Sequence, residues 1–268
     1  MKAPELVSTI LLRLKEHVRP GVTTFTLDAL AEQFLKELGG FSYNKNYHPK
    51  WARFPYPAVL CTSINSEIAH GVPSQRVLKE GDIINIDLGV IDEDGNCGDS
   101  ALTLPVGEIS EKDKILLHYA KNVLYTGIMK IKAGVTLHEL AVAMKRRADE
   151  RKFVINQQFC GHAIGREMHE QPFIYHVPNP YRESEMVEKY QKLMDVELKT
   201  GQVICLEPML TYSDPWGWVD SNTGWTAKTR DGKNSAMFEE MILVKDDGFE
   251  ILTTHLKDEH AFYLRKRR

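Results

Sequence analysis

The stretch EGDIINIDLGVIDEDGNCGDSALTL, residues Glu80–Leu104, places two carboxylates inside an otherwise apolar β pattern. Its first part is β-branched and apolar, the polar cluster around Asp94 is typical of a turn, and an apolar run follows, so the stretch predicts a β-hairpin. Asp87 and Asp99 are equally distant in sequence from Glu93. An unbulged hairpin would therefore set them directly opposite each other, with Cβ atoms about 5 Å apart. Two ionised carboxylates at that distance repel unless they share a proton or bind a cation.

The local sequence of this hairpin recurs later in the chain. LKEGDIINIDL, which begins at Leu78, matches LKTGQVICLEP, which begins at Leu198. HVRPGVTTFTLDALAEQF, near residue 17, likewise matches KIKAGVTLHELAVAM, near residue 130. Two matches in the same order and at similar separations indicate an internally duplicated α/β unit. We expect one catalytic domain over 1–268, with related halves at 1–109 and 110–252.

Each half is expected to begin with two helices and to continue with strands. Apolar periodicity and capping residues predict helices over 6–18, over 26–38 with Thr26 as the N-cap, over 110–131 with Ser110 as the N-cap, and over 137–151. Apolar β-branched runs predict further strands over 58–64 and 203–206 and within 235–244. The predicted fold class is therefore α+β.

The duplication places Glu207 where the first half has Asp87, and makes Glu239 the counterpart of Asp99. Two related hairpins would direct four carboxylates at one shared axis, and such a concentration of negative charge calls for cations. His162, in GHAIGREMHEQP, is the remaining ligand candidate. Four carboxylates and one imidazole suit two divalent ions about 3.5 to 4 Å apart, of Co, Mn, Fe(II) or Zn.

Each of these residues has an ordinary structural explanation when it is taken alone. Asp87 and Asp99 would be turn or cap residues, the two glutamates would be surface acids, and His162 would be a core histidine. All four acids, however, lie in apolar β sequence at positions that the repeat matches. Burying them without partners would cost several kcal/mol each, so the joint pattern favours a metal site.

The composition argues against other classes of function. The chain has 34 Lys plus Arg against 37 Asp plus Glu, and its one basic block is the tail Arg265–Arg268, so no large nucleic-acid surface is expected. That tail is expected to be solvated, with transient ribosome contact as the alternative. The first 18 residues lack the apolar core of a signal peptide, and no stretch reaches membrane-spanning length. Four scattered cysteines indicate a reducing compartment. We expect a cytoplasmic monomer.

Several motifs resemble those of type I methionine aminopeptidases, which have the pita-bread fold. They are SIN followed by HGVP (His70–Pro73), GDIINIDLG with CGD, GHAIGREMHEQP, CLEPM, and GWTAKT followed by SAMFEE. The match covers nearly the whole chain. The resemblance implies two pseudo-twofold related halves with an antiparallel sheet. It also implies that a metal-bridging hydroxide removes the initiator methionine from nascent proteins whose second residue is small. The implied ligands of the two metal ions are Asp87, Asp99, His162, Glu207 and Glu239.

The same resemblance gives roles to further residues. Glu207 would also stand beside the attacking water, and His70 and His169 would contact the substrate. His169 can donate a hydrogen bond to the scissile carbonyl oxygen, and His70 can hold the amide of the next residue. Without the family, His70 reads more simply as a turn histidine. The methionine pocket maps onto Tyr56, Cys61, Met168 and Trp225.

Three features depart from the family pattern. The hairpin turn is one residue longer, Glu240 stands where His is common, and an insertion over 174–199 contains a predicted helix over 183–194. The insertion is read as a passive excursion, with a lid or a dimer contact as alternatives. Two other functions stay open, namely an X-Pro aminopeptidase or dipeptidase of the same fold and a non-catalytic pita-bread binding module.

Overall fold

The computed structural model describes residues 1–178 and 190–256, which form an α+β structure. The helices are α1 Ala3–Lys15, α2 Thr24–Glu37, α3 Glu111–Ile128 and α4 Leu137–Asp149. The strands of the first half are β1 Phe41–Ser42, β2 Cys61–Ile64, β3 Glu67–Ala69, β4 Ile83–Ile91 and β5 Cys97–Pro105. Those of the second half are β6 Val154–Ile155, β7 Gly161–Ala163, β8 Glu170–Ile174, β9 Val203–Leu206, β10 Leu210–Thr211, β11 Trp218–Val219, β12 Ala227–Lys228, β13 Glu240–Lys245 and β14 Gly248–Ile251.

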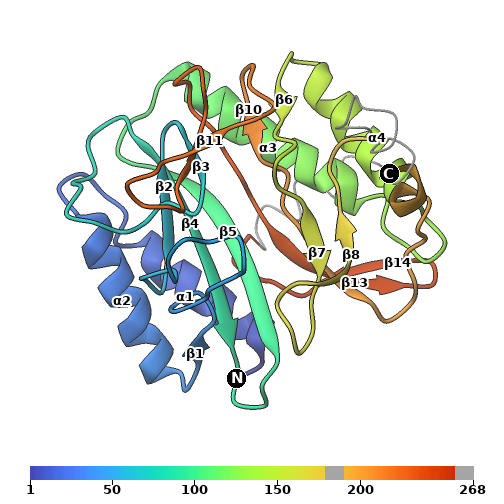
Figure 1. Cartoon of the computed structure of the whole chain (residues 1–268), viewed down its shortest axis with the longest axis horizontal. Helices are drawn as coiled ribbons and strands as arrows, with labels where there is room; N and C mark the ends of the chain where they lie inside the picture. The colour runs from blue at the N-terminus through green and yellow to red at the C-terminus, as the bar shows by residue number, and fades with distance from the viewer. Residues whose placement is uncertain (179–189, 257–268) are drawn as a thin grey trace.

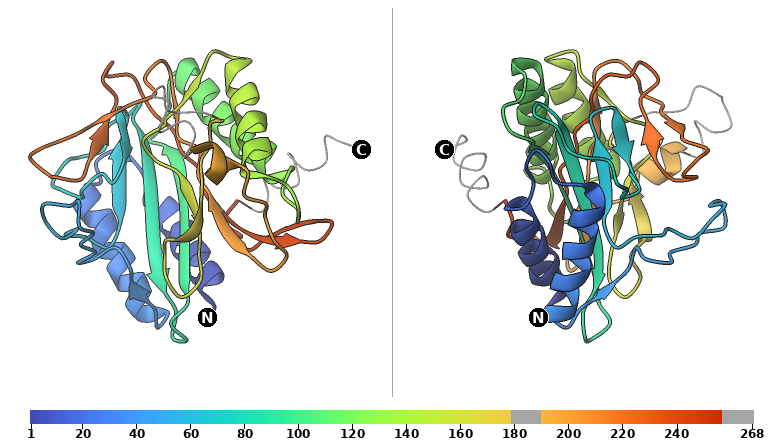
Figure 2. Two further views of the ribbon diagram at one scale, coloured as in Figure 1. Left: turned by 45° about the vertical axis from the view of Figure 1, so that its right-hand side comes forward. Right: turned by 90° about the vertical axis from the view of Figure 1, so that its left-hand side faces the viewer.

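The two largest sheets of the described residues are antiparallel, and one lies in each half. In the first half β4 pairs with β1, β2 and β5, and in the second half the strand order is β14-β13-β9-β7-β8. Figure 1 shows α1 and α2 beside the first sheet and α3 and α4 beside the second. The helices lie on one face of the strands, while the loops near residue 50 and near β11 lie on the other (Figure 2). The apolar stripes of the helices therefore bury one face of each sheet and leave the other face for a site.

The predicted hairpin is present, but its predicted register is wrong. Asp87 pairs with Ala101 and Asp99 pairs with Gly89, so the two acids share a face diagonally rather than directly opposite each other. The Oδ1 atom of Asp92 accepts hydrogen bonds from the backbone N–H groups two and four residues later, at 3.0 and 2.8 Å. These bonds stabilise a five-residue turn whose centre is one residue later than predicted.

Helices α2, α3 and α4 begin after residues that can cap them, and one predicted cap is wrong. Ser110 caps α3 as predicted, since its side chain accepts the N–H of Asp113 at 3.2 Å. Thr26 does not cap α2. The cap is Thr23, whose side-chain oxygen accepts the N–H of Thr26 at 3.1 Å. Thr136 caps α4 in a capping box with Glu139, as expected for a Thr-x-x-Glu sequence.

The two sequence repeats occupy equivalent local structures. Gly21 donates to the carbonyl of Leu78, and Gly134 donates to that of Leu198, each at 2.9 Å. The glycines have φ values of 89° and 81°, in the left-handed region where a side chain would be strained. The bridge of Thr23 to strand residue 77 has its counterpart in that of Thr136 to residue 197. The division into two halves of one domain stays a prediction, which these equivalences support.

The insertion lies only partly within the described residues. Residues 190–194 are helical, and the earlier part of the predicted helix, 183–189, lies outside the described residues. The Tyr190 ring packs edge-on against Tyr175, with centroids 4.8 Å apart, and its hydroxyl donates to the carbonyl of Val177 at 2.6 Å. The two ends of the insertion are therefore held against each other.

Within the described part of the chain, none of the helices is both long enough and apolar enough to cross a lipid bilayer.

Candidate metal centre and substrate pocket

Five predicted residues converge on one cavity from both sheets. Asp87 lies on β4, Asp99 on β5 and His162 on β7, while Glu207 directly follows β9 and Glu239 directly precedes β13. All five line a cavity of about 350 Å³. The backbone N–H of Glu239 donates to the carbonyl of Ala101 at 2.9 Å, and this bond joins the two sheets beside the cavity.

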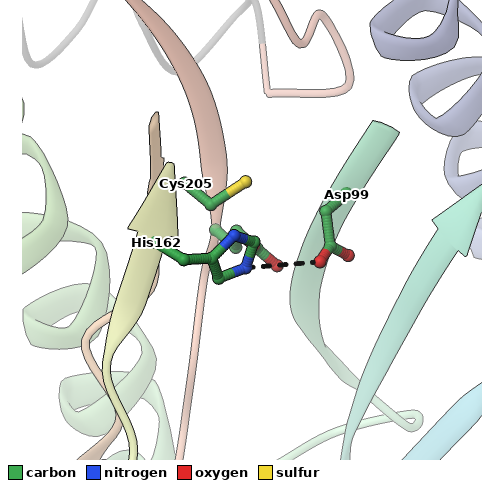
Figure 3. A group of neighbouring side chains, drawn as sticks. Asp99, His162 and Cys205 are labelled. Atoms are coloured by element: carbon green, nitrogen blue, oxygen red, sulfur yellow. Dashed lines mark ion pairs between the residues drawn. The ribbon is translucent and has the colours of Figure 1, made fainter. Parts of the chain in front are cut away.

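His162 is oriented toward the acids by its own backbone. Its Nδ1 lies 3.1 Å from the carbonyl oxygen of Ala163, and a hydrogen bond donated there leaves the lone pair of Nε2 directed into the cavity. Nε2 is 3.7 Å from an oxygen of Asp99 and 3.8 Å from an oxygen of Glu207. Figure 3 shows His162 and Asp99 pointing toward each other from β7 and β5, which belong to different sheets. These separations are longer than hydrogen bonds but short enough for ligands about 2.1 Å from a common ion.

Burial and mutual repulsion raise the pKa values of the carboxylates when no cation is bound. Burial raises the pKa of Asp87 from 3.8 to about 7. Burial, followed by the charge of neighbouring acids, raises the pKa values of Asp99, Glu207 and Glu239 well above their ordinary values. Burial also lowers the pKa of His162 to about 4, which keeps the ring neutral. None of the described residues that line the cavity is Lys or Arg, so the balancing charge must come from elsewhere.

The donor set fits divalent metal ions. Glu239 is 2% exposed, and its Oε1 atom has no hydrogen-bond partner among the described residues. A buried carboxylate oxygen without a partner is costly, and a metal ion would satisfy it. The donor atoms of Asp99, His162, Cys205 and Glu239 all lie within 4.8 Å of one another. Oxygen and imidazole donors of this kind suit Mn, Fe, Co or Zn.

Cys205 belongs to this group and was not predicted from the sequence. It is fully buried on β9 and pairs with His162 across the sheet. Burial, followed by the negative charge of Glu239, raises the pKa of its thiol, so the thiol stays protonated and donates a hydrogen bond to Glu239. The signal for it was strand alternation, since residues 205 and 207 face the same side of β9.

The predicted methionine pocket adjoins the acids. Tyr56, Cys61, Met168 and Trp225 all line the same cavity. The Tyr56 ring meets Trp225 edge-on with centroids 5.2 Å apart, and its hydroxyl donates to the carbonyl of Gly71 at 2.9 Å. The flexible thioether of Met168 packs in a separate apolar cluster with Ile164. Together these side chains form an apolar slot beside the acids.

Two histidines stand at the same cavity outside the group of donor atoms. The His169 ring centroid lies 4.6 Å from that of His162, and the side chain is accessible. His70 has a left-handed φ of 55°, and its ring meets Phe159 edge-on at 5.2 Å. Burial lowers the pKa of His70 to about 4 and also lowers the pKa of His169. Both rings are therefore neutral near pH 7, so each keeps one N–H donor and one acceptor.

Sequence analysis missed one wall of the cavity. Several residues of the segment 41–57 line it, of which the sequence had indicated only Tyr56. The others are Tyr43, Asn44, Tyr47 and Trp51. The available signal was the density of aromatic residues in this segment, which exceeds what a simple connection needs.

Glu240, which stands where the family often has His, does not face this cavity. Strand alternation turns it to the opposite side from Glu239, and it is fully buried there. Its carboxylate accepts hydrogen bonds from the hydroxyl of Tyr125, at 3.2 Å, and from that of Thr253. The departure from the family pattern is thus accommodated behind the site.

Comparison with known proteins places the chain in a family. The model of the metallopeptidase family M24 matches residues 1–246, and the chain belongs to this family. Methionine aminopeptidase 1 of Bacillus subtilis (strain 168) is 35% identical over 252 residues, which cover 94% of each protein. The crystal structure of methionine aminopeptidase from Rickettsia prowazekii has a TM-score of 0.83 at 32% identity and also covers 94% of both chains.

A third similarity extends no further than the fold. The crystal structure of X-Pro aminopeptidase from Thermotoga maritima MSB8 has a TM-score of 0.69 at 24% identity, and the match covers 58% of that chain. The resemblance read from the motifs and the pita-bread fold are confirmed by these comparisons. Family membership and the donor cluster together support the use of divalent metal.

Proposed function

We propose that this protein is a methionine aminopeptidase that removes the initiator methionine from peptides and nascent proteins whose second residue is small. The observation that carries the proposal is the convergence of four carboxylates and one imidazole beside an apolar slot in a single cavity. The names and coverage of the relatives support the methionine assignment. The X-Pro alternative is not favoured, because that structure is less similar, with a TM-score of 0.69 at 24% identity against 0.83 at 32%. The intact donor set gives no support to a non-catalytic module.

Two divalent ions would be held by Asp87, Asp99, His162, Glu207 and Glu239. When bound, such a pair lowers the pKa of water to about 7 and thereby supplies a nucleophile at neutral pH. Availability in the cell decides which of Co, Mn, Fe(II) or Zn occupies a site of this donor type.

The surrounding side chains position the reacting groups. A carboxylate oxygen of Glu207 accepts the proton of the attacking water and later delivers it to the leaving amine. The backbone N–H of Glu207 donates to Nε2 of His176 at 3.4 Å, which helps to fix this segment. His169 donates its ring N–H to the scissile carbonyl oxygen as negative charge develops there. His70 binds the backbone of the second substrate residue.

Specificity for methionine follows from the shape and flexibility of the slot. Tyr56 and Trp225 form rigid aromatic walls, while Met168 can adapt to an unbranched thioether. A charged side chain would be desolvated there without a partner. The rings of His70 and Phe159 border the position of the second residue, and we expect them to exclude bulky side chains.

The test is methionine release from Met-Ala-Ser by purified protein, under anaerobic conditions with Fe(II), Mn(II) or Co(II). Leu-Ala-Ser and Ala-Pro-Ser serve as matched control peptides. We expect release from the first peptide, with kcat/KM at least 100-fold above either control, and loss of activity in Glu239→Ala. Equal cleavage of Ala-Pro-Ser would favour the X-Pro alternative, and no release with any metal would refute the proposal.

Cytoplasmic location, a monomeric state and transient ribosome contact stay predictions of the sequence. The cysteines that support a reducing compartment are all unpaired in the structure, and three of them are buried.

A further inference from the structure

The aromatic segment between Tyr43 and Tyr56 carries an exposed tryptophan at the cavity. Trp51 is 65% exposed, yet it lines the same cavity as the acids. Its ring meets that of Trp225 edge-on, with centroids 5.1 Å apart. Trp225 is itself only 4% exposed and forms a wall of the methionine slot. Trp51 therefore extends this wall outward into solvent.

The segment holds Trp51 in place through hydrogen bonds on both sides of it. The backbones of Asn46 and Tyr47 each bond that of Tyr56 at 2.8 Å, which closes the loop at its base. On the other side, the indole N–H of Trp225 donates to the carbonyl of Phe54 at 3.0 Å. A large apolar ring that is held exposed to solvent beside a cavity can contact a molecule that enters the cavity.

We propose that Trp51 binds the side chain of the third residue of the substrate and favours an aromatic or large apolar residue there. This inference rests on the proposed function, since it takes the N-terminal methionine to occupy the slot beside Trp225. In an extended peptide the first and third side chains point to the same side, about 7 Å apart. The Trp51 ring centroid lies 5.1 Å from that of Trp225, which places Trp51 within reach of the third side chain.

The chemistry of the surface favours apolar occupants. Tyr47 adds a third ring beside Trp225, with centroids 6.3 Å apart. None of the described residues that line the cavity is a lysine or arginine that could pair with an acidic side chain, and four carboxylates would repel one. An aromatic side chain would instead cover the exposed face of Trp51 and remove apolar area from water.

The test compares methionine release from Met-Ala-Phe-Ser and Met-Ala-Gly-Ser. In the metal-loaded wild type we expect kcat/KM to be about fivefold to tenfold higher for the phenylalanine peptide, mainly through a lower KM. In Trp51→Ala this ratio should fall to near one, and Trp51→Phe should retain most of it. Each variant is normalised to its own value for the glycine peptide, so a general loss of activity does not affect the ratio.

Phe41→Ala is the matched control, because Phe41 is 64% exposed on β1 but does not line the cavity. This variant should keep the wild-type ratio. If Trp51→Ala cleaves both peptides with the wild-type ratio, the third-residue assignment is overturned and the peptidase function stands. If wild type releases methionine from neither peptide, both the proposed function and this inference are overturned.

Discussion

The substitution Gly161→Ala should disrupt the candidate metal site by displacing the strand that carries His162. Gly161 lies on β7 next to His162, and β7 pairs with β9 at Cys205. A Cβ atom at Gly161 would overlap the backbone oxygen of Cys205, falling about 1 Å short of an ordinary contact. The obstacle is backbone rather than a flexible side chain, so β7 itself must move.

Such a movement carries His162 away from the acids. A displacement of about 1 Å at a catalytic position lowers activity by roughly 100-fold, and overpacking of this kind lowers the free energy of unfolding by about 1 to 3 kcal/mol. We therefore expect Gly161→Ala to fold, to bind divalent metal more weakly and to lose about 100-fold in kcat/KM for Met-Ala-Ser. Circular dichroism, metal titration and methionine release measure the three quantities.

Gly248→Ala is the matched control for this change. Gly248 begins β14 in the same sheet, a Cβ atom there would meet nothing within 4 Å, and its φ is not in the left-handed region. We expect this variant to keep wild-type activity and metal binding. Activity of Gly161→Ala within threefold of wild type would show that the position of β7 does not set the geometry of the site, and would refute the reasoning.

Three further changes test other parts of the structure. In the presence of EDTA, Asp87→Asn should gain stability relative to wild type as the pH rises from 4 toward 7. Burial raises the pKa of Asp87 from 3.8 to about 7, so over this range the acid ionises first in the unfolded chain and progressively destabilises the metal-free fold of wild type. Urea unfolding across this pH range measures the difference, and a difference that moves the other way contradicts the shift. His169→Ala should lower kcat by 100-fold to 1,000-fold with unchanged metal content, because the ring stands outside the donor group; loss of metal, measured by atomic emission, would assign His169 to the metal shell instead. Asp28→Ala should lower the free energy of unfolding by about 2 kcal/mol, since the Asp28 carboxylate accepts the backbone N–H groups of Val59 and Leu60, each at 2.9 Å. Glu32→Ala, which removes a half-exposed acid one turn along α2, should change it by less than about 0.5 kcal/mol, and equal effects would contradict the anchoring role of Asp28.

Helices and strands whose ends depend on nearby residues were predicted closely from the sequence. The strand predicted over 203–206 matches β9, and the helix predicted from Ser110 begins where its cap places it. The start of α2 was missed because Thr23 and Thr26 are both good caps. Thr23 also bridges to Val77, and that long-range contact decides between them.

The register of the β4–β5 hairpin was also predicted wrongly. Symmetry about the turn placed Asp87 opposite Asp99, but the bonds made by the Asp92 side chain shift the centre of the turn by one residue. Side-chain capping of a turn depends on geometry that residue counting does not contain. The error left both acids on the same face, because a shift of the centre by one residue changes the pairing by two.

The sequence by itself selected the four acids that line the cavity. Strand alternation and the internal repeat select Asp87, Asp99, Glu207 and Glu239, because both patterns are local or compare two segments of the same chain. Only the tertiary structure decided that these acids and His162 share one cavity, that Cys205 supports Glu239, and that Trp51 stands at the same cavity. Those facts depend on the packing of two sheets and on a long loop closed by its own hydrogen bonds, and distances between segments far apart in sequence are set by that packing.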